Sequence, residues 1–177
     1  MVKVQVAPDA PPPLHPADAR GEYKWLSSDH IGLPPGHPQR IDLGPNVNVN
    51  AALTNAARHG GVRVVTSVVY GFKMEPAAAA ALLERCRGPQ LAHVNLRALP
   101  VSADHIVALA QASPNIEVLD TNGKHDIGFT TFLRLCAMLP RLKFIDLRET
   151  GAHGRLQYMR PDKITAATGN PLLLVDL

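Results

Sequence analysis

Cysteine, aromatic residues and charge are all scarce in this chain. Only two cysteines occur, Cys86 and Cys136, far below the density of a disulfide framework, and this favours a reducing compartment. Aromatic residues make up 5% of the sequence, so a core must be built from Leu, Val, Ile and Ala. A chain of 177 residues fits one domain plus an appendage, which argues against a two-domain enzyme.

Long hydrophobic runs are also missing. No stretch approaches the ~20 apolar residues that a membrane-spanning helix requires. Residues 1–4 run directly into prolines, and this segment lacks both the hydrophobic stretch of a secretory signal and the arginine-rich pattern of a transit peptide. We therefore expect an intracellular protein, with the cytoplasm and the mitochondrion both left open.

The charge balance does not specify a partner. Eighteen basic residues against fifteen acidic ones give a formal net charge of +3, and the basic excess is greatest over residues 141–163. No aromatic stacking platform is interleaved there, so the sequence does not favour nucleic acid as a partner. Neither a phosphate-binding glycine loop nor metal-ligand spacing among the eight histidines is present. We expect no metal and no cofactor, and no small-molecule substrate is evident.

Proline is concentrated at the N-terminus. Eight of the sixteen prolines fall within residues 1–38, and this predicts an extended, proline-rich arm that cannot propagate a helix. The arm contains Trp25, the single tryptophan, followed by Leu26. Because amphipathic aromatic side chains carry much of the energy of binding, we expect Trp25 and Leu26 to dock on the body or on a neighbouring subunit.

From residue 39 onward, short blocks of the form apolar-x-apolar recur every 25 to 30 residues. The blocks begin at Ile41, Val68, Val94, Leu119, Ile145 and Val175. Alternate residues of an extended strand share a face, so each block predicts one short strand. Helical patterns lie between them, over residues 77–86, 103–112 and 129–138. The predicted fold class is α/β, with a parallel sheet and helices in about five units over residues 39–177.

The blocks Leu91-x-x-Val94-x-Leu96 and Leu142-x-x-Ile145-x-Leu147 resemble the strand signature of the leucine-rich repeat family. The unit length is similar to that of its helix-containing members, the ribonuclease-inhibitor-like and cysteine-containing types. The resemblance implies a short solenoid with the sheet on its concave side and helices on its convex side. It bears on the fold more than on the function.

One departure from the family concerns the residue three positions after each strand. The family places a buried Asn or Cys there, whereas this chain has Lys73, Leu99, Lys124 and Thr150. Buried backbone groups need hydrogen-bond partners, so we expect those on this side of the solenoid to be satisfied in another way.

The outward positions of the later strands predict an interface. Val118, Phe144 and Leu174 would form an exposed apolar strip with charged residues beside it, and such a strip is typical of a protein interface, with Phe144 as its anchor. The predicted partner-binding residues on this face are Val118, Asp120, Phe144, Asp146, Arg148, Leu174 and Asp176. In the alternative, residues 1–38 cover the strip within the same chain. The last strand has no following cap, so a further contact is expected at that end.

These features predict a non-enzymatic protein–protein interaction module, an accessory or scaffold subunit whose partners are other protein subunits. The alternative is an adaptor or effector-type binding module that acts transiently. A remote alternative is a hydrolase, because Ser67, His93 and Asp120 fall in Ser-His-Asp order on predicted neighbouring strands. Ser67 lacks a glycine-flanked nucleophile turn and no oxyanion donors are evident, so ordinary hydrogen bonds are favoured over catalysis.

Overall fold

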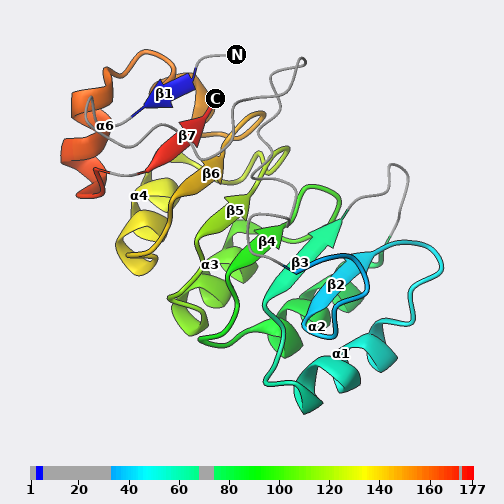
Figure 1. Ribbon diagram of the computed structural model, residues 1–177. Coiled ribbons are helices and arrows are strands. Elements are labelled where there is room, and N and C mark those ends of the chain that lie inside the picture. The colour runs from blue at the N-terminus through cyan, green and yellow to red at the C-terminus, as the bar shows by residue number, and fades with distance from the viewer. Residues whose placement is uncertain (1–2, 6–32, 68–73, 172) are drawn as a thin grey trace.

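Strands and helices alternate along the chain in the computed structural model, which describes residues 3–5, 33–67, 74–171 and 173–177 (Figure 1). The strands are β1 (Lys3–Gln5), β2 (Arg40–Leu43), β3 (Val64–Ser67), β4 (His93–Asn95), β5 (Val118–Asp120), β6 (Phe144–Asp146) and β7 (Leu174–Asp176). The helices are α1 (Val49–Arg58), α2 (Pro76–Cys86), α3 (Ala103–Ala112), α4 (Phe129–Met138), α5 (His153–Leu156) and α6 (Pro161–Thr168).

The strands form one sheet in the order β1-β7-β6-β5-β4-β3-β2. From β2 to β7 all pairings are parallel, and strands that are consecutive in the chain are neighbours in the sheet. Figure 1 shows helices α2, α3 and α4 on the same side of this sheet. The sheet therefore grows by one strand per strand-helix unit, as in a solenoid. The predicted α/β class, a parallel sheet alternating with helices, is confirmed.

The apolar template of each unit fills the space between the sheet and the helices. Leu91, Val94 and Leu96 are fully buried, and the equivalent residues of the β6 unit, Leu142 and Ile145, are no more than 1% exposed. Each such side chain stabilises the fold by about 1.5–3 kcal/mol through burial alone. The same three-position spacing in successive units therefore builds one continuous core.

The three helices predicted from periodicity are confirmed, and α3 and α4 begin and end at the expected residues. Pro76 takes the first position of α2, where its missing N–H costs nothing. The Asp126 carboxylate accepts a hydrogen bond from the Ala103 N–H at 2.6 Å, so the following unit caps the start of α3. Helix α1 was not predicted, because Leu53 and Ala56 are its only buried side chains.

The position of the second strand was wrong in the sequence-based alignment. That alignment placed it at Val68, but the strand is β3, and Val65 pairs with Ile41 of β2 and with Val94 of β4. The segment around β3 carries several valines at alternate and adjacent positions, so a period of two fits more than one register. Residues 68–73 lie outside the described residues.

The edge of β7 is paired. Strand β1 runs antiparallel to it, with Lys3 opposite Asp176 and Gln5 opposite Leu174. The further contact expected at this end is thus made within the chain, because β1 supplies backbone partners for this edge. Most of the predicted arm, residues 6–32, lies outside the described residues.

Candidate functional site

The third residues of β4 to β7 form a polar column across the sheet, on the face turned away from the core. Asn95 lies opposite Asp120, Asp120 opposite Asp146, and Asp146 opposite Asp176. The three aspartates are at most 1% exposed. We call these four residues the acidic column. Three neighbouring carboxyl groups without water need strong compensation, because like charges on adjacent strands repel.

Part of that compensation comes from the backbone just after each strand. In three units the side-chain oxygen of the column residue accepts a hydrogen bond from the N–H two residues later, which is the geometry of an Asx turn. These bonds run from Arg97 to Asn95 (3.1 Å), from Asn122 to Asp120 (3.0 Å) and from Arg148 to Asp146 (3.0 Å). The column thus fixes how the chain leaves the sheet in successive units.

Arg148 supplies the positive charge of the column. Its Nη2 donates to Asp146 Oδ2 at 2.5 Å, and its Nε lies 3.1 Å from both Asp146 oxygens and 3.4 Å from Asp176 Oδ2. The hydrogen bond that Arg148 donates to Asp146 raises the pKa of the Arg148 guanidinium. One half-buried cation thereby bridges two buried carboxylates on neighbouring strands.

Asp120 is the column carboxyl that Arg148 does not contact directly. Burial, together with the nearby charge of Asp146, raises the pKa of Asp120 to about 7, although the Asn122 N–H and the charge of Arg97 act in the opposite direction. A carboxyl with such a pKa suits general acid–base chemistry. No nucleophile accompanies it among the described contacts, and its own hydrogen bond is one that shapes a turn.

Lys124 is a buried polar residue that follows β5. Its Nζ donates to the Leu99 carbonyl at 2.5 Å and lies 3.4 Å from the Arg97 carbonyl, both in the preceding unit. In the next unit Thr150 Oγ1 donates to the Leu147 carbonyl at 2.6 Å. Burial lowers the pKa of the Lys124 amine. The expectation that carbonyls on this side find other donors is confirmed at both positions.

The predicted exposed apolar strip is not exposed. Val118 and Phe144 are fully buried in the isolated chain, and the half-buried Leu174 packs against them. Val118 pairs with Phe144 and Phe144 with Leu174 in the sheet register. The alternation of residues along each strand correctly predicted that these side chains lie on the second face. Exposing a row of apolar side chains to water is unfavourable, so the row is buried instead. At β5 and β6 the first residues on this face, Val118 and Phe144, are as fully buried as the core.

The remaining predicted partner-binding residues fall into two groups. Asp120, Asp146 and Asp176 are sealed in the acidic column, and the Arg148 side chain is 24% exposed. Trp25 and Leu26 lie outside the described residues, as does most of the segment proposed as a cover in the same chain, residues 1–38.

The sheet register does not place Ser67 directly opposite His93. The residue opposite His93 on β3 is Val64, and Ser67 lies three residues farther along that strand, opposite Leu43. Among the residues that the structure describes, no group of three His, Cys, Asp or Glu side chains could hold a metal ion.

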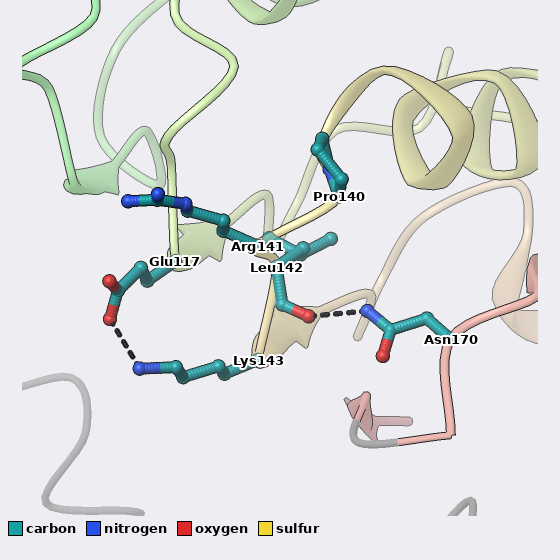
Figure 2. Close-up of a pocket in the computed structure, with 6 residues that line it drawn as sticks. All are labelled: Glu117, Pro140, Arg141, Leu142, Lys143 and Asn170. Atoms are coloured by element: carbon teal, nitrogen blue, oxygen red, sulfur yellow. Dashed lines mark hydrogen bonds and ion pairs between the residues drawn. The ribbon is translucent and has the colours of Figure 1, made fainter.

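A pocket of about 310 Å³ lies where the strands β5, β6 and β7 begin (Figure 2). Its lining comes from three successive units: Glu117, Pro140, Arg141, Leu142, Lys143 and Asn170. Lys143 Nζ lies 2.7 Å from Glu117 Oε2, and Asn170 Nδ2 donates to the Leu142 carbonyl at 2.7 Å. Sequence reasoning missed this pocket. The available signal was the opposite charge of Glu117 and Lys143, each one residue before a strand.

No protein-family model, curated protein or solved structure matches the chain. In the described part of the chain, no helix is both long enough and apolar enough to cross a bilayer.

Proposed function

We propose that this chain is a leucine-rich-repeat interaction module without catalysis of its own, acting as an accessory or scaffold subunit of a multi-protein complex. The observation that carries the proposal is the sheet order, in which β2 to β7 follow one another in chain order. Such a stack repeats the same loops and turns along one direction, and it offers an extended surface that suits another macromolecule better than a small ligand.

Burial limits where that recognition can occur. On the second face of the sheet, Val118 and Phe144 are buried. The carboxylates of Asp120 and Asp146 in the acidic column already accept hydrogen bonds from turn N–H groups, and Asp146 also accepts from Arg148. Among the described residues, the surfaces that remain for recognition include the two rims where strands begin and end, and the exposed helix corners. Tyr158, which is 84% exposed between α5 and α6, is one side chain of the kind that interfaces use as an anchor.

Co-purification tests the proposal. The full chain, carrying a small affinity tag, would be expressed in its native source, purified, and analysed by size-exclusion chromatography with light scattering and mass spectrometry. We expect a second protein to co-migrate in a fixed ratio through both steps, and the tag alone to retain nothing. A monodisperse monomer without a stoichiometric companion, before and after cross-linking in cells, would contradict the proposal. A companion recovered only after cross-linking would favour the transient adaptor alternative.

A further inference from the structure

The pocket at the strand-entry rim has an unequal set of charges in its lining. Leu142 is only 1% exposed, while Arg141 and Lys143 are exposed on the rim. Figure 2 shows the charged ends of Arg141, Glu117 and Lys143 on the same side of the pocket. Glu117 forms an ion pair with Lys143, whereas Arg141 forms no ion pair within the described residues. The lining therefore holds one positive charge in excess.

Three backbone carbonyls of the pocket lining already accept hydrogen bonds. The Leu142 carbonyl accepts from Asn170 Nδ2, and the Glu117 carbonyl accepts from the N–H groups of Lys143 and Phe144. The Lys143 carbonyl accepts from the Leu174 N–H. What remains on the rim is the fork of donors of Arg141 and the unused donors of Lys143. Available cationic donors fit a ligand that brings acceptors and negative charge, such as a carboxylate.

The charge distribution along the chain agrees with an acidic partner. Residues 129–177 contain seven basic and four acidic residues, a balance of +3, whereas residues 1–128 contain eleven of each, a balance of zero. Two of the four acidic residues, Asp146 and Asp176, are buried in the acidic column. The surface of the final units is therefore more basic than the sequence count suggests, and it favours the approach of a negatively charged partner.

The size and openness of the pocket favour a side chain of a protein over a free metabolite. A volume of about 310 Å³ is at the lower limit for small-molecule sites, which enclose most of their ligand. Here Pro140, Arg141 and Lys143 are all exposed, so the pocket is a shallow notch in a rim. A notch of this kind holds one side chain of a partner whose remaining contacts lie on the surrounding surface.

We propose that this pocket receives an aspartate or glutamate side chain from an acidic segment of a partner protein, with its carboxylate between Arg141 and Lys143. The inference rests on the proposed interaction function and specifies the surface and the chemistry of its partner. Glu117 competes with the incoming carboxylate for Lys143, so it tunes the affinity. Exposed ion pairs are individually weak, and binding at this pocket weakens as salt rises.

Two peptides of equal length provide a first test: a fluorescein-labelled peptide with six glutamates and the same peptide with six glutamines. Binding to the full chain is measured by fluorescence anisotropy at low salt. We expect the glutamate peptide to bind, the glutamine peptide not to bind, and Arg141→Gln to weaken binding about tenfold. Arg134→Gln on α4 removes the same charge from an exposed position outside the pocket and serves as the matched control, with an expected change of less than twofold.

The Glu117→Gln substitution should increase the affinity for the glutamate peptide, which a purely structural role of Glu117 would not predict. The substitution removes the competing carboxylate and leaves Lys143 unpaired, so the glutamate peptide should bind about threefold more tightly. Equal losses in the Arg141 and Arg134 variants, or an oligonucleotide of the same charge binding as well as the peptide, would overturn the inference in favour of a general basic surface. Circular dichroism of each variant confirms that it is folded.

The co-purified companion separates this inference from the proposed function. If Arg141→Gln retains the companion as well as the unaltered chain does, the pocket is not the recognition site, while the interaction function stands. If the unaltered chain retains no companion, the interaction function fails, and the two peptides still decide whether the pocket binds acidic side chains.

Discussion

Asp120 is the residue at which the environment changes the chemistry of a side chain most clearly. Its pKa is about 7 in the folded chain, whereas an unfolded aspartate has a pKa of about 3.9. Between these values the folded state binds more protons than the unfolded state, so the free energy of unfolding falls as pH rises from about 4 to about 7. The charged groups that act on Asp120 are Asp146, Arg97 and Arg148, and Lys124 also lies within electrostatic reach.

Asp120→Asn should abolish that slope. The amide oxygen still accepts from the Asn122 N–H, and no buried charge has to form, so we expect the variant to be more stable than the unaltered chain above pH 7, by on the order of 1–3 kcal/mol. Urea denaturation at several pH values from 4 to 8 measures the effect, with the exposed Asp104→Asn as control. A slope that persists in the Asp120 variant would assign the titration to another group.

Phe144 belongs to a second small core. Phe144→Asp should unfold the chain, because it removes a large buried side chain, worth about 3–5 kcal/mol, and places a charge where there is no water. Phe144→Leu should cost about 1–2 kcal/mol and leave a cooperative transition. Thermal denaturation followed by circular dichroism distinguishes the two. A Phe144→Asp variant with unchanged stability would mean that the side chain faces solvent.

At the scale of the element, the turns after the strands are held by side chains that reach into the preceding unit. Lys124→Met keeps much of the aliphatic volume but removes the donor to the Leu99 and Arg97 carbonyls. We expect a loss of about 1–2 kcal/mol in the free energy of unfolding. Lys163→Met on the exposed face of α6 should change it by less than about 0.5 kcal/mol. Similar effects at both positions in chemical denaturation would show that Lys124 contributes no net hydrogen-bond energy.

The accuracy of sequence-based prediction also differs from element to element. Helix α3 was predicted to the residue, because Ile106, Leu109 and Ala110 repeat with helical spacing and Ser102 precedes them. The strand β3 was misplaced because its valines fit several registers. The pairing of β1 with β7 could not be predicted, since three residues carry no periodic signal and their partner lies at the far end of the sequence.

The candidate site shows a different limit. The alternation of residues along a strand correctly placed Val118 and Asp120 on the face opposite the core. The same alternation does not tell whether that face of the sheet is exposed to solvent. The aspartates of the acidic column were therefore predicted as surface residues, although they are buried. The pocket went unnoticed because its lining comes from turns of three units, whose proximity depends on the stacking rather than on any local motif.

At the scale of the whole molecule, the reactivity of the two cysteine thiols measures how often the whole chain unfolds. Cys86 on α2 and Cys136 on α4 are buried and free, and burial raises the pKa of each to about 12. At pH 8 the folded chain therefore holds almost no thiolate, and both groups should react with a disulfide reagent only through unfolding. We expect two equivalents to react, at rates that rise in parallel with urea. A thiol that reacts rapidly in native buffer would show that its helix opens on its own.

The place of β1 beside β7 has a consequence for how the chain assembles. Neighbouring strands from β2 to β7 are close in sequence, so most of the sheet can zip up progressively as each unit leaves the ribosome. The pairing of Lys3 with Asp176 spans nearly the entire sequence and must wait until synthesis has reached the last unit. Of the described strands, the one that is made first is thus the one that closes the sheet last.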